Sequence, residues 1–153
     1  MRGWVVALAL AATPAHAAHY MVADVADVIP EEHHAALARA GVANTAVLYE
    51  RLVTRAGRAS LAAATGIAVA RLDEWAAFLD LMQLDGVGPT MVRVLNAAGV
   101  PNLAVFQTAD ASILLPKMRA ANVGNRLSQV LPPVDVVKAW IDAARRVKVR
   151  LER

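Results

Sequence analysis

The residues best suited to contact a phosphate group lie in one short stretch, Gly86-Val87-Gly88-Pro89-Thr90, and Arg93 follows on the next helical turn. A glycine turn that leads into a helix can present backbone N–H groups to an anion, because a helix N-terminus carries partial positive charge. The Thr90 hydroxyl and the Arg93 guanidinium would add contacts of the kind that proteins make to a DNA backbone. The same glycines also suit a sharp turn between closely packed helices, and Asp85 beside them disfavours an anion. Both interpretations stay open.

Two further groups of basic residues could bind an acidic partner. The first comprises Arg51, Arg55 and Arg58, and we expect it to form a solvated helix face near Glu50. The second lies in the last nine residues and comprises Arg145, Arg146, Lys148, Arg150 and Arg153. Cations at the end of a helix complement its dipole, and they can also bind anionic lipid or nucleic acid in a salt-dependent way. We expect this basic tail, residues 148–153, to be a frayed helix end.

Catalytic and metal-binding chemistry finds little support in the residue types present. Glu31, Glu32, His33 and His34 are adjacent, and neighbours on a helix point about 100° apart, so they cannot readily hold one ion. No serine lies in a nucleophile-elbow pattern, and no Walker loop or dinucleotide fingerprint is present. The sequence also contains no cysteine. We therefore expect a protein that is not an enzyme, with no catalytic residue, metal, cofactor or small-molecule substrate indicated.

The glycine stretch is framed by two expected helices. Apolar residues recur every three or four positions over residues 69–83 and again over 89–98. Gly99 is expected to end the second helix, and Asn102 to cap a short third one. One or two more helices are expected around Pro116 and Gly124, and a last helix from about residue 133. No segment alternates apolar and polar residues for long enough to predict a sheet, so the predicted fold class is all-α.

An internal repeat becomes visible when the sequence is compared with itself at an offset of 58 residues. "RAGVANTAVL" at 39–48 then aligns with "AAGVPNLAVF" at 97–106, so that Gly41 pairs with Gly99 and Asn44 with Asn102. Self-similarity of this kind predicts repeated structural units. We expect two related helical units, at about residues 24–82 and 83–147, packed into one compact domain that spans residues 19–147.

The two copies differ at the turn itself. The offset places Val28-Ile29-Pro30 over the glycine stretch, and Glu31 and Glu32 follow immediately. Carboxylates at a helix N-terminus occupy the electrostatic role that a bound anion would take. The first turn is therefore predicted to be structural, and the second is the candidate for phosphate contact.

Composition places further limits on function. Hydrophobic residues make up 58% of the 153 residues but aromatic residues only 5%. The formal net charge is +3, yet residues 19–144 carry ten basic against twelve acidic side chains. A nucleic-acid module usually carries a basic face across its body, so this distribution disfavours strong DNA binding.

The first 18 residues have the layout of a secretory signal peptide. Arg2 precedes an apolar run from Trp4 to Ala12, and Ala15-His16-Ala17 forms a small-x-small cleavage pattern. The run is too short to span a bilayer. The predicted location is periplasmic or secreted if this segment is a signal peptide, and cytoplasmic otherwise. No transmembrane segment is expected in the mature chain.

Over about residues 20–147 the sequence resembles the family catalogued as domain of unknown function 4332. The similar segments are "TGIAVARLDEWAAFLDLMQLDGVG", "LNAAGVPNLAVF" and "LPPVDVVKAWIDAARR", with Trp75 and Trp140 at matching places. The resemblance implies tandem helix-hairpin-helix units, similar to the hairpins of DNA-repair and recombination proteins, and it implies no activity. We expect both tryptophans to anchor the core.

Two functions of different classes remain after the sequence analysis. The first is a non-catalytic helix-hairpin-helix module that binds DNA, without sequence specificity, through Gly86, Val87, Gly88, Thr90 and Arg93. The second is a protein-interaction or scaffold domain that keeps the hairpins and has lost phosphate binding. The acidic body, the altered first turn and the predicted export motivate the second function, and both functions stay open.

Overall fold

The computed structural model describes residues 19–153, which form eight α-helices and no β-strand, so the all-α prediction is confirmed. The predicted signal peptide, residues 1–18, lies outside the described residues. Two short 3₁₀ helices, Val22–Val25 and Glu31–His33, precede the first α-helix. The α-helices are α1 His34–Arg39, α2 Thr45–Leu52, α3 Arg55–Thr65, α4 Val69–Leu81, α5 Pro89–Ala97, α6 Leu103–Gln107, α7 Ala111–Asn125 and α8 Val134–Arg146.

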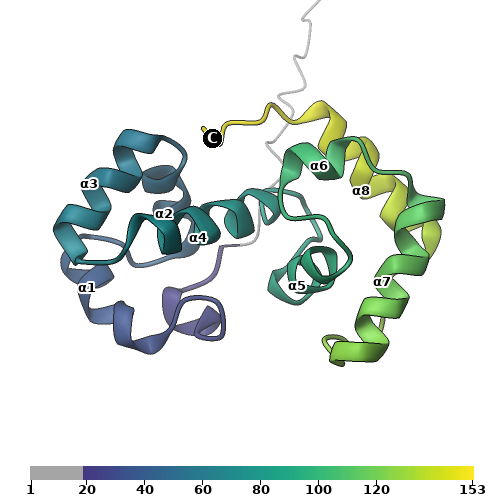
Figure 1. Ribbon diagram of the computed structural model, residues 1–153, viewed down its shortest axis with the longest axis horizontal. Helices are drawn as coiled ribbons and strands as arrows, with labels where there is room; N and C mark the ends of the chain where they lie inside the picture. Colours follow the sequence, from purple (N-terminus) through teal and green to yellow (C-terminus); the bar gives the residue numbers. More distant parts are fainter. Residues whose placement is uncertain (1–18) are drawn as a thin grey trace, which may run out of the picture.

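Helix α4 runs between two groups of helices (Figure 1). On one side it packs against α2 and α3, which also pack against each other, and near its C-terminal end it contacts α6. On the other side α5 packs against α7, and α8 packs against both α6 and α7. After α8 the chain crosses back over the molecule toward the α2–α3 side, as the yellow trace in Figure 1 shows.

The repeated sequence positions adopt the same local conformation. Gly41 and Gly99 both have positive φ, at 79° and 91°, after α1 and α5 respectively. The Asn44 side chain accepts a hydrogen bond from Val47 N at 2.9 Å, and the Asn102 side chain accepts one from Val105 N at 3.1 Å. Each asparagine thereby caps the helix that follows it. The helices expected from these signals are α2 and α6.

The segment around Pro116 and Gly124 forms one helix, α7, with both residues inside it. The Asp110 side chain begins this helix by accepting from the backbone N–H groups of Ser112 and Ile113. A proline inside a helix removes one backbone hydrogen bond, but the buried Leu114, Leu115 and Met118 hold α7 against its neighbours.

The core extends through both groups of helices. Its largest fully buried side chains are Trp75, Phe106, Ile29, Leu37, Leu48, Leu52, Leu72, Leu79, Leu81, Leu95, Leu103 and Met118. The expectation for the tryptophans is confirmed for Trp75, whereas Trp140 is only half-buried at the edge of α8. The reason for this difference is that Trp140 covers the second turn rather than the core interior.

One buried carboxyl group joins three helices. Asp80 of α4 accepts from the Tyr49 hydroxyl of α2 at 2.8 Å and from Leu103 N, at the start of α6, at 3.3 Å. Burial raises the pKa of Asp80, although both hydrogen bonds act in the opposite direction. Burial and the neighbouring carboxyl group also raise the pKa of the Tyr49 hydroxyl. Asp80 thus links the first group of helices to the second.

Among the described residues, no helix has the length and apolar character needed to cross a membrane.

Candidate functional site

The second turn places the predicted site residues together between α4 and α5. Gly86 adopts a positive φ of 79°, Val87 is buried, and Gly88 is the N-cap of α5. Pro89 occupies the first helical position, where its missing N–H is not needed. Thr90 is exposed. The backbone therefore has the form that an anion-binding turn would need.

Aromatic side chains lie against both glycines. A methyl group added at Gly86 would stand 3.0 Å from Trp140 Nε1, and one added at Gly88 would stand 3.2 Å from the Tyr20 hydroxyl. Both distances are shorter than ordinary van der Waals contact between carbon and these atoms. Positive φ and packing against Trp140 account for glycine at position 86, and Tyr20 leaves little room for a side chain at position 88.

The arginine of the turn is already paired. Arg93 forms an ion pair with Asp27, and 27% of the Arg93 side chain is exposed. Partial burial lowers the pKa of the Arg93 guanidinium, so the fold gives this cation a carboxylate partner in a partly desolvated setting. An open groove of about 710 Å³ lies beside the pair and is lined by Asp24 as well as Asp27 and Thr90. A phosphate entering this groove would meet two carboxylates.

The first turn has no anion-binding form. Ile29, which aligns with Val87, is fully buried, and Pro30 precedes the 3₁₀ helix in place of Gly88. The exposed carboxylates of Glu31 and Glu32 lie in the first turn of this helix. The geometry agrees with a structural role for this turn.

The two histidines have separate contacts. His34 Nε2 lies 2.7 Å from the carbonyl oxygen of Ile29. His33 lies 3.4 Å from a Glu32 oxygen, and its ring meets that of Trp75 edge-on at 5.4 Å between centroids. Within residues 19–153, no three His, Cys, Asp or Glu side chains gather as metal ligands would. The side-chain nitrogen of Trp75 is buried and has no hydrogen-bond partner among the same residues.

The arginines of the α2–α3 region do not form one solvated face, because Arg58 is buried. Arg51 and Arg55 are exposed as expected, but only 4% of Arg58 is exposed. Its guanidinium donates to Leu52 O at 2.6 Å and to Glu152 O at 2.7 Å, and it lies 2.5 Å from Asp73. The prediction of a solvated face was wrong at Arg58 because acceptors on α4 and in the C-terminal segment join Leu52 O around its guanidinium.

The basic tail is docked rather than frayed. Glu152 N donates to Val53 O at 2.8 Å, and a Glu152 side-chain oxygen accepts from Arg55 N at 2.9 Å, next to the cap of α3. Arg150 makes two hydrogen bonds of 2.7 Å to Glu50, and its guanidinium lies 5.7 Å from the centre of the Tyr49 ring. The prediction of a frayed end was wrong because acceptors on α2 and just after it, Glu50 and Val53 O, and N–H donors on α3 bind this segment.

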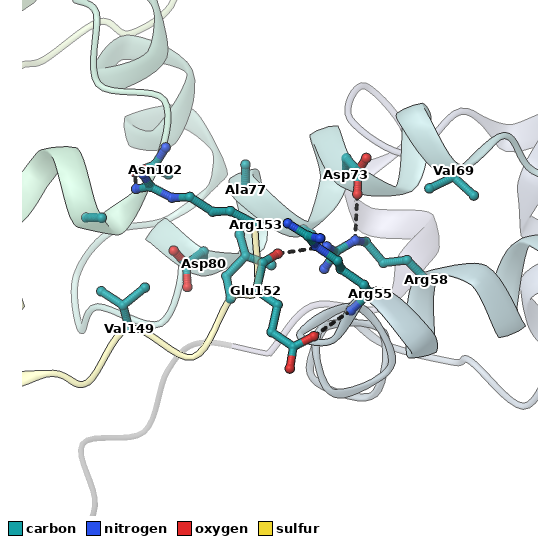
Figure 2. A pocket seen from close by; sticks show the side chains of 13 residues that line it. Arg55, Arg58, Val69, Asp73, Ala77, Asp80, Asn102, Val149, Glu152 and Arg153 are labelled. Carbon is teal, nitrogen blue, oxygen red and sulfur yellow. Dashed lines mark hydrogen bonds and ion pairs between the residues drawn. The ribbon is translucent and has the colours of Figure 1, made fainter.

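A pocket of about 540 Å³ lies where residues 149–153 cross α3, α4 and α6 (Figure 2). We call it the seam pocket, because it lies between the two groups of helices. Its charged residues are Arg55, Arg58, Asp73, Asp80, Glu152 and Arg153. Sequence reasoning missed it. The one available signal was Asp80, a charged residue within the apolar stripe of α4.

The comparisons with known proteins place the chain in a family. The family model described as Domain of unknown function (DUF4332) matches residues 28–147. The chain belongs to this family. Neither the curated proteins nor the solved structures gave a match. The match covers both turns of this DUF4332 protein and ends where the docked C-terminal segment begins, so its function is argued from its own residues.

Proposed function

We propose that this DUF4332 protein is a non-catalytic interaction or scaffold domain that does not bind phosphate through its second turn. The observation that carries the proposal is the ion pair between Arg93 and Asp27. Arg93 is the cation that the DNA-binding alternative requires, and a phosphate would have to displace a carboxylate that the fold already holds beside it.

Two further observations support this proposal. Tyr20 and Trp140 lie against the glycines of the turn, so these glycines have a packing role. The net acidic charge of residues 19–144 opposes the electrostatic attraction that dominates nonspecific DNA affinity.

The direct experiment is fluorescence anisotropy of a labelled DNA duplex titrated with the purified protein at about 20 mM and 150 mM salt. We expect no saturable binding by the wild type at either salt concentration. The Asp27→Asn variant, in which Arg93 loses its carboxylate partner, serves as the comparison. We expect any increase in DNA binding over the wild type to appear in this variant. Wild-type binding that weakens steeply with salt and is abolished by Arg93→Gln would favour the DNA-binding alternative instead.

The positive test is site-specific photo-crosslinking in the native cell fraction. The most exposed large apolar side chains of the described residues are Val123, at 81%, and Val130, at 77%, at the end of α7 and in the loop after it. Exposed apolar surface is where a protein partner gains most from contact. We expect a crosslinker at Val130 to yield one defined adduct that a crosslinker at the exposed Ala63 of α3 does not give. No adduct from either position would contradict the proposal.

A further inference from the structure

The seam pocket contains arginine side chains with unused N–H donors, whereas the arginine of the second turn, Arg93, is paired with a carboxylate. The volume of about 540 Å³ lies within the range of roughly 300–1,000 Å³ that small-molecule sites occupy. Its floor is built from Ala76, Ala77 and Ala104, whose small side chains leave the space open, and Val149 and Leu151 add apolar walls. An apolar ligand body can therefore be accommodated here.

The carboxylates of the pocket are already engaged. Asp73 pairs with Arg58 at 2.5 Å, and Glu152 accepts from Arg55 N at 2.9 Å. Both oxygens of Asp80 accept hydrogen bonds, one from Tyr49 and one from Leu103. Figure 2 shows Asp73 bonded to Arg58 and Glu152 bonded to Arg55 N at the pocket, with Asp80 beside them. Each of these three carboxyl groups therefore already has at least one donor partner.

The cations are engaged less completely. Arg58 is buried, and each of its three guanidinium nitrogens has an acceptor, two carbonyl oxygens and Asp73. By contrast, the Arg55 guanidinium has no hydrogen-bond or ion-pair partner among residues 19–153, and the Arg153 guanidinium makes one long contact, 3.4 Å to Asn102 Oδ1. These two guanidinium groups come from α3 and from the C-terminal segment, on different sides of the pocket (Figure 2).

We propose that the seam pocket binds a small organic carboxylate with an apolar body. The alanine floor and the Val149 and Leu151 walls hold the body, and either Arg55 or Arg153, on different sides of the pocket, binds the carboxylate. A guanidinium presents a planar fork of donors that matches a carboxylate with two parallel hydrogen bonds. The inference does not depend on the proposed interaction function, because no residue of the second turn lines this pocket.

The C-terminal segment supplies part of the pocket wall, so ligand binding and docking of this segment are coupled. Val149, Leu151 and Arg153 line the pocket, and they are held by the Arg150–Glu50 pair and the Glu152 hydrogen bonds. A ligand that binds only the docked form stabilises that form by linkage. The segment therefore becomes more resistant to carboxypeptidase when the pocket is filled.

The test is isothermal titration of the purified protein with octanoate and with phenylacetate, using 1-octanol and acetate as controls. We expect saturable binding of at least one of the two carboxylates with a dissociation constant below about 1 mM. 1-Octanol lacks the carboxylate and acetate lacks the apolar body, so each control is expected to bind at least about tenfold more weakly.

Variants locate the binding. The Arg55→Gln/Arg153→Gln double variant is expected to weaken binding about tenfold or more, and Ala77→Leu, which fills the floor, to abolish it. The exposed pair Arg39→Gln/Arg119→Gln, on α1 and α7, is the matched control and is expected to have no effect. Thermal melts show whether each variant is folded. No saturable binding of either carboxylate, equal binding of 1-octanol, or unchanged binding in the Arg55/Arg153 variant would overturn the proposal.

Discussion

The second turn and the seam pocket both contain arginine beside aspartate, but they use these charges differently. At the turn, Arg93 pairs with Asp27, and aromatic side chains lie against the glycines, so the residues that suggest anion binding are used in packing. At the seam, the buried charges hold distant segments together, and two exposed guanidinium groups remain with few contacts. A backbone motif therefore indicates a site only when its side chains are free to bind a ligand.

The strongest test of this contrast removes the buried cation of the seam. Arg58→Ala leaves Leu52 O, Glu152 O and Asp73 without their donor, so we expect the free energy of unfolding to fall by about 3 kcal/mol. Arg55→Ala, on the exposed neighbour, is the control and is expected to change it by less than about 0.5 kcal/mol. Urea denaturation of the two variants measures both values. Equal small effects would show that the seam does not rely on Arg58.

At the turn, alanine substitution separates backbone strain from contact with Trp140. Gly86 and Gly99 both have positive φ, but only at Gly86 would the new methyl group meet another side chain, Trp140, at 3.0 Å. We expect Gly86→Ala to lower the free energy of unfolding by about 2 kcal/mol and Gly99→Ala by about 1 kcal/mol. Adding Trp140→Leu should remove the difference. If the two glycine variants are equally destabilised, packing against Trp140 does not explain Gly86.

Asp80 makes the stability of the protein depend on pH in a direction that can be predicted. Because burial raises its native-state pKa above the unfolded value, Asp80 contributes stability below the unfolded pKa and loses it as the pH rises through the native pKa. We therefore expect the free energy of unfolding of the wild type, relative to Asp80→Asn, to fall as the pH rises from about 3.9, the ordinary pKa of an aspartate, through the raised native pKa. Denaturation of both proteins across this range measures the difference. A relative stability that rises with pH would contradict the assignment.

The Glu50–Arg150 pair is expected to have the smallest effect and the opposite slope. The hydrogen bonds from Arg150 lower the pKa of Glu50, so the pair stabilises the protein above the unfolded pKa and is lost as the pH falls through the native one. Both side chains are largely exposed, so Glu50→Gln should cost less than about 1 kcal/mol at pH 7. Salt should reduce this cost further. A larger, salt-independent cost would mean that the pair is effectively buried.

The helices and the glycine turn followed from local signals, whereas the seam pocket and the partners of the charged residues at both sites did not. The apolar spacing over residues 69–83 and the Asn102 cap lie within one or two helical turns of the features they predict, and α4 and α6 form there. Arg150 and Glu50 are 100 residues apart, and Arg58 and Glu152 are 94 apart, so no local pattern indicates that they meet. Separation in sequence also hid the Arg93–Asp27 pair, on which the proposed interpretation of the glycine turn rests.

The contrast between the turn and the seam is tested most directly by amide NMR spectra of the protein, recorded during separate titrations with octanoate and with a DNA duplex at low salt. The account predicts that octanoate shifts the amide signals of Ala77, Ala104 and Leu151, and that DNA leaves those of Gly88, Thr90 and Arg93 in place. Salt-sensitive shifts at Gly88 and Thr90 on adding DNA, with no response of the seam to octanoate, would contradict it.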